Sequence, residues 1–328
     1  MSLKRVSPPR GRIALIMTGG TIAMAGDVGA QPDSTRESEI VDAVKALAGN
    51  ITVFRANNKP SPHVTFEDVR HLADLITRLA QTDAQGIVIT HGTDTLEDVA
   101  IALDLSIDVE IPVVITGALR PADHPGADGA ANLVAAVRVA LHPSTGKGVF
   151  VVVHDEIHAA RFVMKQHASA AGAFASPGLG PIGWLSEGSP YLMLRPPQSP
   201  TIAWRRTPSE VVVVTPGLAQ EATSVHRLLA SPPAGVIVAG LGGGHVPVGW
   251  IEPLEQLAGM IPCILSSRCM AGGSLRSTYS YAGSERDLLS RGLISGGAMQ
   301  ASKARILLAL LLAADIPLEQ IKKTFEQY

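Results

Sequence analysis

The 328-residue chain has the composition of an ordinary globular protein, with 46% hydrophobic residues, 17% charged residues and a net charge of -2. This length and composition permit a large buried core and two domains. Because the charge is near neutral and no block of like charges occurs, nothing favours a nucleic-acid or membrane partner. We therefore expect a small-molecule ligand.

Apolar runs near both ends of the chain are too short for targeting or membrane segments. Residues 13–17 fall short of a secretory leader's apolar core. Residues 306–314 fall short of the ~20 apolar residues that span a bilayer. Cys263 and Cys269 are the only cysteines and have no partners at zinc spacing, so we expect two thiols in a cytoplasmic protein.

The N-terminal part of the chain alternates strand-like and helix-like segments. The predicted strands span residues 12–17, 51–54, 86–90, 112–116 and 148–154, and the predicted helices span 37–48, 66–81, 95–106 and 129–141. Continuous Val and Ile runs in such an alternation are typical of a mostly parallel sheet covered by helices on both faces. We predict an α/β fold whose large N-terminal domain spans residues 1–195.

A Pro-rich polar stretch interrupts this pattern and predicts a linker over residues 196–209. Beyond it, strand-like runs return at residues 210–215, 235–239 and 262–266, with helical segments between them and at 303–313 and 318–328. Residues 210–328 are therefore predicted to form a smaller C-terminal α/β domain.

The first candidate motif, Thr18-Gly19-Gly20-Thr21-Ile22-Ala23, follows the first predicted strand. Its glycines allow backbone N–H groups to approach a ligand closely. It lacks both the lysine of a phosphate-binding loop and the spacing of a dinucleotide fingerprint. A simple tight turn is the structural alternative. Residues 24–36 contain many small residues and no aromatic one, which suits a lid over bound substrate, an unstructured connector being the alternative.

The second motif, Thr90-His91-Gly92-Thr93-Asp94-Thr95, joins the third predicted strand to a helix whose start is marked by Thr95-x-x-Asp98. In an open α/β sheet, ligands bind at the carboxyl ends of the strands. The Thr93 hydroxyl and the Asp94 carboxylate are therefore candidates for contact with a ligand.

These two hexapeptides, in this order and about seventy residues apart, resemble the paired signature of the bacterial-type L-asparaginases, a family of Thr-dependent amidohydrolases. The resemblance implies catalytic roles for Thr21, Thr93, Asp94 and Lys165, with no cofactor and no metal. A lone Lys165 would otherwise be a solvated surface residue. Buried beside a hydroxyl, its neutral amine could accept a threonine proton.

The same resemblance implies how an amino-acid amide would be held. Ser61 would bind the α-carboxylate of the substrate, and Asp94 would face its α-ammonium group. Gly20, Gly92 and Ala118 would line the rest of the substrate site, together with Thr93. The implied partner is thus a small amino-acid amide.

Other suggestive patterns favour structural interpretations. The stretch Gly240-Leu-Gly-Gly-Gly-His245 lacks dinucleotide spacing and a following helix, so a Gly-rich turn explains it better. Asp123, His124 and Asp128 fit no zinc or calcium pattern. We interpret His91 as structural, because the sequence shows no partner for a catalytic base.

The chain departs from the family around the side-chain end of the pocket. Well-studied members carry a lid tyrosine, whereas the first tyrosine here is Tyr191. Pro62 stands where the family often has Gln, and Gly243 with His245 stands where it often has Asn. The preference for asparagine over glutamine or another amide therefore stays open.

Two tyrosines of the C-terminal domain could replace the missing phenol. The family normally forms tetramers built from intimate dimers, in which a neighbouring subunit contributes an acid to the site, so the resemblance implies a homotetramer or homodimer here. The corresponding stretch of this chain carries Tyr279 and Tyr281. We hypothesise that Tyr279, or failing it Tyr281, reaches Thr21 of another subunit. The alternative is that both tyrosines belong to a strand and pack the second domain.

The resulting prediction is an L-asparaginase-like enzyme that converts L-asparagine to L-aspartate and ammonia through a threonine nucleophile. Thr21 would attack the amide carbon while backbone N–H groups near Gly20 and Thr93 stabilise the oxyanion. Thr93 is either the activator of water or the primary nucleophile. The alternatives are a glutaminase, another amide hydrolase, or a catalytically weak amino-acid-binding protein.

Overall fold

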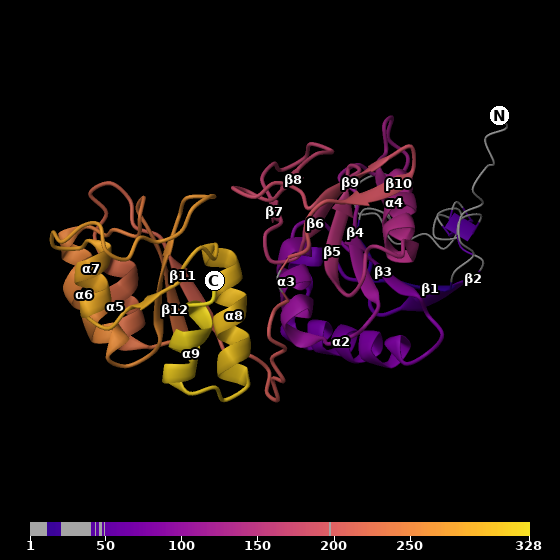
Figure 1. Ribbon diagram of the computed structural model, residues 1–328. Helices are drawn as coiled ribbons and strands as arrows, with labels where there is room; N and C mark the ends of the chain where they lie inside the picture. The colour runs from indigo at the N-terminus through magenta and orange to yellow at the C-terminus, as the bar shows by residue number, and fades with distance from the viewer. Residues whose placement is uncertain (1–11, 21–40, 43, 46–47, 49, 197) are drawn as a thin grey trace. The chain divides into compact units, whose positions relative to one another are not determined.

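The computed structural model describes residues 12–20, 41–42, 44–45, 48, 50–196 and 198–328 (Figure 1). The chain divides into two compact units, Met1–Thr201 and Ile202–Tyr328. This division falls within the segment 196–209 that was predicted as a linker. Each unit has its own mainly parallel sheet with helices, so the predicted α/β class is confirmed.

The N-terminal unit is built on an eight-stranded sheet with the order β10-β9-β6-β5-β4-β3-β1-β2. Its strands are β1 (Arg12–Met17), β2 (Asn50–Arg55), β3 (Gly86–Thr90), β4 (Pro112–Thr116), β5 (Gly148–Val153), β6 (Glu156–Ala159), β9 (Gly183–Ser186) and β10 (Ser189–Leu192). The five strands predicted from the sequence, β1 to β5, are parallel to one another. The other three add to one edge in antiparallel order.

The antiparallel extension begins at a turn that sequence patterns did not indicate. β5 ends at Val153, one residue before the predicted end, and pairs with β6 through a two-residue turn. Both turn residues, His154 and Asp155, have positive φ angles, 52° and 59°. Such hairpins usually contain Asn-Gly or Asp-Gly, so His-Asp gave no turn signal. A short ribbon of β7 (Met164–Lys165) and β8 (Phe174–Ala175) follows.

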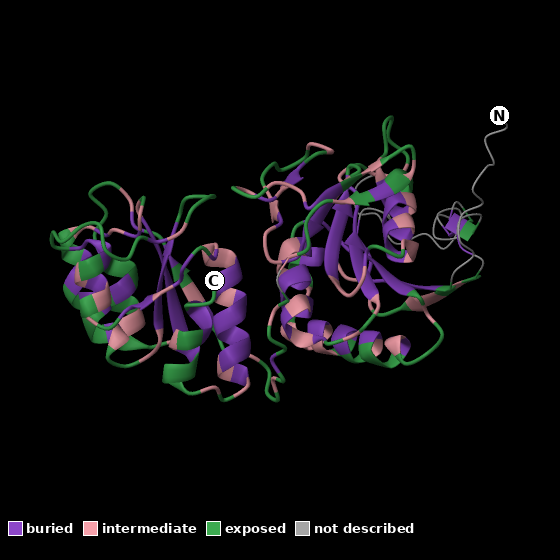
Figure 2. Cartoon of the chain, viewed as in Figure 1, coloured by how far each residue is buried: buried purple, intermediate pink, exposed green. Residues whose placement is uncertain are grey.

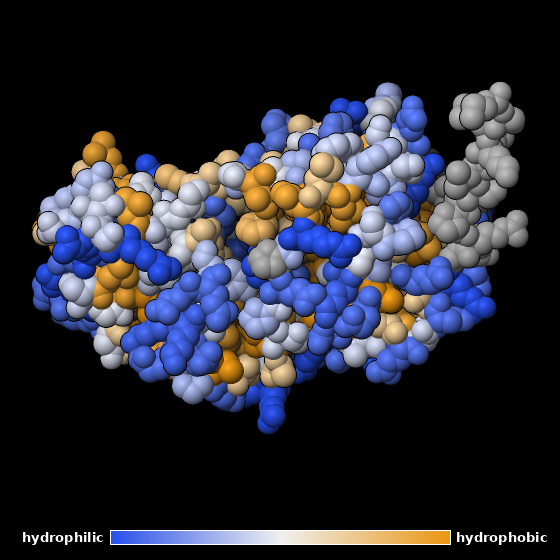
Figure 3. All heavy atoms as spheres, in the orientation of Figure 1, coloured by the Kyte–Doolittle hydropathy of each residue, from blue (hydrophilic) through white to orange (hydrophobic). Residues whose placement is uncertain are grey.

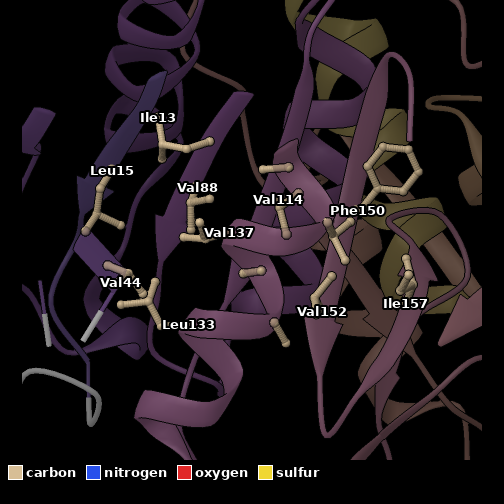
Figure 4. Close-up of a cluster of buried hydrophobic side chains, with 14 of the residues drawn as sticks. Ile13, Leu15, Val44, Val88, Val114, Leu133, Val137, Phe150, Val152 and Ile157 are labelled. Atoms are coloured by element: carbon tan, nitrogen blue, oxygen red, sulfur yellow. The ribbon is translucent and has the colours of Figure 1, made fainter. Parts of the chain in front are cut away.

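Three described helices pack on this sheet: α2 (Phe66–Ala80), α3 (Leu96–Ser106) and α4 (Gly129–Leu141). Leu133 and Val137 of α4 meet alternate residues of the central strands, including Val88, Val114 and Val152 (Figure 4). The intervening strand residues are buried as well, and α2 and α3 also contact the sheet (Figure 2). Burial on both faces explains the continuous Val and Ile runs. Most of predicted helix 37–48 lies outside the described residues.

The two predicted helix starts differ in the structure. At α2, the Thr65 hydroxyl accepts the Asp68 N–H while the Asp68 carboxylate accepts the Thr65 N–H, which completes a capping box. At α3, Thr95 makes no such cap. Its hydroxyl donates instead to the Ser61 carbonyl, 2.8 Å away. The helix therefore starts at the predicted place, with Thr95 as its N-cap residue, but the Thr95 side chain makes a tertiary contact and forms no capping box.

The C-terminal unit contains a smaller parallel sheet of order β11-β12-β13-β14, as predicted. Its strands are β11 (Val211–Val214), β12 (Gly235–Gly240), β13 (Cys263–Ser267) and β14 (Ile294–Ser295), and its helices are α5 (Thr223–Ala230), α6 (Ile251–Ala258), α7 (Glu285–Ser290), α8 (Ala301–Ala313) and α9 (Leu318–Phe325). The fully buried Trp250 packs in its core. The Trp250 indole N–H donates to the Gln220 carbonyl at 2.8 Å.

The polarity of the surface and the state of the cysteines agree with the expectations from the composition. On the face drawn in Figure 3, hydrophilic side chains are interspersed with hydrophobic ones. Within the described part of the chain, every helix is too short or too polar to cross a membrane. Both cysteines are free thiols, Cys269 exposed and Cys263 buried, and burial raises the pKa of Cys263 to about 12.

The close approach of α4 to β3 gives a test of packing. A Cβ added at Gly86 would lie 2.5 Å from the Ala140 backbone oxygen, and that oxygen cannot rotate away as a side chain would. We expect Gly86→Ala to lower the free energy of unfolding by about 1–3 kcal/mol, as overpacking does. Urea denaturation measures this free energy. Gly249→Ala, where a Cβ meets open space, is the control and should change little. Equal stability of both variants with the parent would contradict this packing.

Candidate active site

The two sequence motifs meet because their strands are neighbours. β1 and β3 are paired in parallel, with Met17 opposite Thr90. Beyond the paired residues, the Thr18 hydroxyl donates to the Thr90 carbonyl at 2.8 Å. Gly20 then passes so close to Gly92 that a Cβ on Gly20 would lie 2.6 Å from the Gly92 nitrogen. Both motifs therefore lie at the carboxyl edge of the parallel strands, where ligands bind in open α/β sheets.

Lys165 reaches this edge from the short ribbon and contacts the second motif. Its Nζ lies 2.9 Å from Thr93 Oγ1 and 2.6 Å from Asp94 Oδ1. Thr93 is buried, whereas the Asp94 side chain is 61% exposed and can reach a ligand. The Lys165 backbone N–H donates to the carboxylate of Glu97, at the start of α3. The structure thus brings together three of the four predicted catalytic residues, here named the Thr93–Asp94–Lys165 cluster.

The fourth predicted catalytic residue, Thr21, lies outside the described residues, as does the predicted lid over residues 24–36. The described chain ends at Gly20 on this side and resumes beyond the lid. Thr21 directly follows Gly20 in sequence, and Gly20 contacts Gly92. The role of Thr21 therefore stays a prediction.

The hydrogen bonds of Lys165 link the two other members of the cluster. Its Nζ forms an ion pair with Asp94 at 2.6 Å and donates to Thr93 Oγ1. Acceptance of the Thr93 proton by a neutral Lys165 amine stays a prediction.

Ser61, the predicted ligand of the substrate carboxylate, supports the second motif. It begins the short 3-10 helix Ser61–His63 and is buried. Its Oγ accepts the Asp94 N–H at 3.3 Å. A Cβ on Gly92 would lie 2.7 Å from that Oγ, so glycine is needed at the contact. A serine hydroxyl that accepts one hydrogen bond still has a proton to donate, and Ser61 could give it to a carboxylate.

Ala118 lies in the turn after β4, directly behind the second motif. It is buried, and a Cβ on the preceding Gly117 would lie 2.5 Å from the His91 carbonyl oxygen. The Asp128 carboxylate holds this turn by accepting the Leu119 and Arg120 N–H groups, at 3.1 Å and 2.9 Å. Asp128 therefore has a structural task. Among the described residues, no group of three or more His, Cys, Asp or Glu is placed to hold a metal ion.

His91 is buried within the motif, and its Nδ1 lies 2.7 Å from the Gly92 carbonyl oxygen. A carbonyl only accepts, so Nδ1 carries the proton. Burial lowers the pKa of His91, and the bond to Gly92 opposes that shift only partly. The imidazole is neutral at pH 7 and holds the motif backbone, consistent with the structural interpretation.

An open pocket adjoins the Thr93–Asp94–Lys165 cluster. Its volume is about 360 Å³, and it is lined by Asp94, Glu97, Lys165, Gln166, His167 and Ala168. A second cavity of about 230 Å³ lies near the beginning of β5 and is lined in part by Asp104, Lys147 and Arg161. The first pocket is the relevant one, because it contains two of the predicted catalytic side chains.

Tyr279 and Tyr281 lie in a loop of the C-terminal unit, so the alternative that they pack within a strand is wrong. Their side chains are 45% (Tyr279) and 51% (Tyr281) exposed. The Tyr281 hydroxyl lies 2.8 Å from His245 Nδ1, at the end of the predicted Gly-rich turn. Sequence patterns did not indicate that Glu285 lies behind His245, because only the tertiary fold brings these residues together.

Comparisons with known proteins agree with this arrangement. A family model described as "Asparaginase, N-terminal" matches residues 12–198, and "Glutaminase/Asparaginase C-terminal domain" matches residues 210–325. The L-asparaginase of Bacillus licheniformis is 33% identical over 313 residues, covering 92% of this chain and 96% of that protein. A probable L-asparaginase of Deinococcus radiodurans is 36% identical over 324 residues, covering 96% and 97%. The crystal structure of a probable cytoplasmic L-asparaginase from Campylobacter jejuni matches with a TM-score of 0.86 at 30% identity, covering 97% of this chain and 100% of that one.

The chain has two α/β units, and the first of them carries a threonine, an aspartate and a lysine at the carboxyl edge of its sheet. Together with the family match, this arrangement places the protein in a class of amidohydrolases. These enzymes hydrolyse amide bonds. Within that class, the chain belongs to the asparaginase family, whose two domain models together match residues 12–198 and 210–325.

The buried imidazole of His91 makes stability dependent on pH. Its folded-state pKa lies below its unfolded value, so its contribution is fully present above about pH 6.5 and is lost as the pH falls through the folded pKa. In His91→Asn, the amide can still donate to Gly92 but does not titrate. We expect the variant to lose less unfolding free energy than the parent between pH 7.5 and pH 5, measured by urea denaturation. Identical losses would show that His91 does not carry this dependence.

Proposed function

We propose that the protein hydrolyses the side-chain amide of L-asparagine to L-aspartate and ammonia. The observation that carries this proposal is the Thr93–Asp94–Lys165 cluster at the edge where both motifs meet. An amino acid is a zwitterion, and the two turns at this edge offer a matching pair of groups. The exposed Asp94 carboxylate suits the α-ammonium, and the Ser61 hydroxyl suits the α-carboxylate.

In the proposed reaction, Thr21 Oγ attacks the amide carbon of the substrate, and the carbonyl electrons move to oxygen. Backbone N–H groups near Gly20 and Thr93 stabilise that oxyanion. The C–N bond then breaks as the nitrogen takes up the proton that Thr21 has lost, and ammonia leaves. Water hydrolyses the acyl-enzyme and returns a proton to Thr21. Thr93, polarised by Lys165, activates this water or is itself the nucleophile. The close contact of Gly20 with Gly92 supports a single site for both threonines.

Substrate binding would change the contacts of Lys165. In the free site, Lys165 forms an ion pair with Asp94 and a hydrogen bond with Thr93. An incoming α-ammonium group would compete with Lys165 for the Asp94 carboxylate. Binding of the amino acid would therefore act directly on the residue that polarises Thr93.

The assembly would be a homotetramer or homodimer in which the C-terminal unit of one copy supplies a phenol to the site of another. Exposure of Tyr279 and Tyr281 supports this arrangement. A cytoplasmic location is supported by the two free thiols and by the similarity to the Campylobacter jejuni protein.

Substrate preference is the first test. We expect purified protein to release ammonia from L-asparagine faster than from L-glutamine or D-asparagine, because the pocket must match one side-chain length and one stereochemistry. Coupled ammonia detection measures all three rates. Faster release from L-glutamine would favour a glutaminase, for which Pro62, Gly243 and His245 are the relevant departures from the family. No release from any amide would overturn the proposal in favour of an amino-acid-binding protein.

The cluster itself is the second test. We expect Thr93→Val and Lys165→Met each to lower turnover of L-asparagine by about 10³-fold or more at pH 7, because each removes a proton-transfer partner. Lys147→Met is the matched control, since Lys147 pairs with Asp108 and Glu110 away from the cluster. Steady-state kinetics and circular dichroism separate loss of chemistry from loss of folding. Near-parental turnover in either cluster variant would exclude that residue from the mechanism.

A further inference from the structure

Lys165 belongs to the β7–β8 ribbon, which has a small hydrogen-bonded structure of its own. Its strands form a sheet separate from the main one and pair over two residues each. The Gln166 N–H also donates to the Ala173 carbonyl at 2.7 Å. These bonds join one half of the ribbon to the other. Because an isolated two-stranded ribbon is marginally stable, contacts with the rest of the N-terminal unit must fix the place of Lys165.

The backbone N–H of Lys165 points out of this ribbon. In an antiparallel pair, residues whose N–H groups bond to the opposite strand alternate with residues whose N–H groups point outward. Gln166 bonds across the ribbon to Ala173, so its neighbour Lys165 faces outward. There, the Glu97 carboxylate accepts the Lys165 N–H. Hydrogen bonds to an ionised acceptor are roughly twice as strong as those between neutral groups, so Glu97 is a firm anchor for the ribbon.

Glu97 is part of the same helix start that holds the other end of the Lys165 side chain. It lies in the first turn of α3, shortly after Asp94 in the chain. Lys165 Nζ bonds to Thr93 Oγ1 at 2.9 Å and to Asp94 Oδ1 at 2.6 Å. The segment 93–97 therefore holds both the backbone and the Nζ of one lysine.

Holding the lysine backbone matters because its side chain is long. A flexible four-carbon stem gives Nζ many possible positions relative to Cα. The bond to Glu97 limits where the Lys165 backbone can lie, so the stem reaches Thr93 from one fixed point. Misplacement of a reacting group by about 1 Å can cost on the order of 10²-fold in rate. The contact of Glu97 with the ribbon therefore bears directly on the contact between Nζ and Thr93.

Glu97 also lines the open pocket beside the Thr93–Asp94–Lys165 cluster. An acid at that place could instead bind the α-ammonium group of a substrate. The observed bond favours the positioning role, because the ribbon backbone engages the Glu97 carboxylate. The two roles also have different requirements. An anchor for the ribbon needs a hydrogen-bond acceptor, whereas a site for an ammonium group needs a negative charge.

We propose that Glu97 is a positioning residue of amide hydrolysis, which places Lys165 on Thr93 by holding the backbone of the β7–β8 ribbon. The inference rests on the proposed function, in which Lys165 polarises Thr93. It adds a residue of α3 to those that the two motifs and the family resemblance indicate. Glu97 acts through Lys165 and takes no part in the bonds that form or break.

Hydrogen exchange tests the anchor without reference to activity. In the parent protein, the Lys165 amide should exchange slowly, as followed by NMR. Glu97→Ala removes the acceptor, so exchange at this amide should become about 10-fold faster or more, as loss of a hydrogen bond to a charged group predicts. Amides of the eight-stranded sheet should keep their parental rates. Glu97→Gln keeps an oxygen that can accept the bond, so it should keep slow exchange. Equal exchange at Lys165 in the parent and in Glu97→Ala would overturn the inference.

Kinetics test the positioning role. We expect Glu97→Ala to lower kcat for L-asparagine by about 10- to 100-fold with little change in KM, because Nζ is misplaced in the complex with bound substrate. Glu97→Gln should restore most of kcat, since it keeps the acceptor and loses only the charge. If Glu97 bound the α-ammonium group instead, both variants would raise KM. That result would contradict the positioning role.

Glu67→Ala is the matched control, because Glu67 lies in the first turn of another helix, α2, where it pairs with Arg70. It should keep parental kinetics and parental exchange at Lys165. A parental kcat in Glu97→Ala would overturn the inference even if exchange at Lys165 rises. If Thr93→Val and Lys165→Met are inactive in the same assay, the proposed function still stands. If the parent releases no ammonia from any amide, the proposed function fails and the positioning role with it, while the exchange experiment still decides whether Glu97 anchors the ribbon.

Discussion

The site depends on a backbone contact between two turns that approach within van der Waals limits. Gly20 lies against Gly92, and Gly92 in turn lies against Ser61, so three segments distant in sequence share one small volume. A Cβ at either glycine would push the turns apart. Because β1 and β3 are paired directly below, the sheet holds both turns in place. The glycines of both motifs are thus required by packing before any ligand is considered.

Lys165, from a different part of the chain, adds a charged side chain to these two turns. Lys165 does not belong to the main sheet, but to the ribbon of β7 and β8 that follows the antiparallel edge. The hydrogen bond from its backbone to Glu97 anchors the ribbon to α3, the same helix that continues from the second motif. A helix start therefore positions both Asp94 and, indirectly, its lysine partner.

The strands that are buried on both faces could be predicted from the sequence alone. β3, β4 and β5 are runs of mainly Val and Ile residues, which the burial of both faces produces, and β12 follows the same rule. β2 is an edge strand with no fully buried residue, and its alternating pattern still predicted a strand. β6 to β10 have two to four residues each, too short for a periodic pattern, and the His154-Asp155 turn before β6 contains no glycine. Likewise, the motifs located Thr93 and Asp94. The ion pair of Lys165 with Asp94 and the grouping of Tyr281 with His245 and Glu285 depend on distances that only the folded chain creates.

The ribbon of β7 and β8 has a consequence for how activity responds to heat. Its two strands contain two residues each, and Met164 and Lys165 are only partly buried. Segments with few buried contacts open locally at a lower free energy than the whole domain. Opening of this ribbon would remove the lysine from Thr93 while the eight-stranded sheet stays folded. If Lys165 has the proposed catalytic role, the ribbon therefore sets the temperature at which catalysis ceases, and the sheet sets the temperature at which the domain melts.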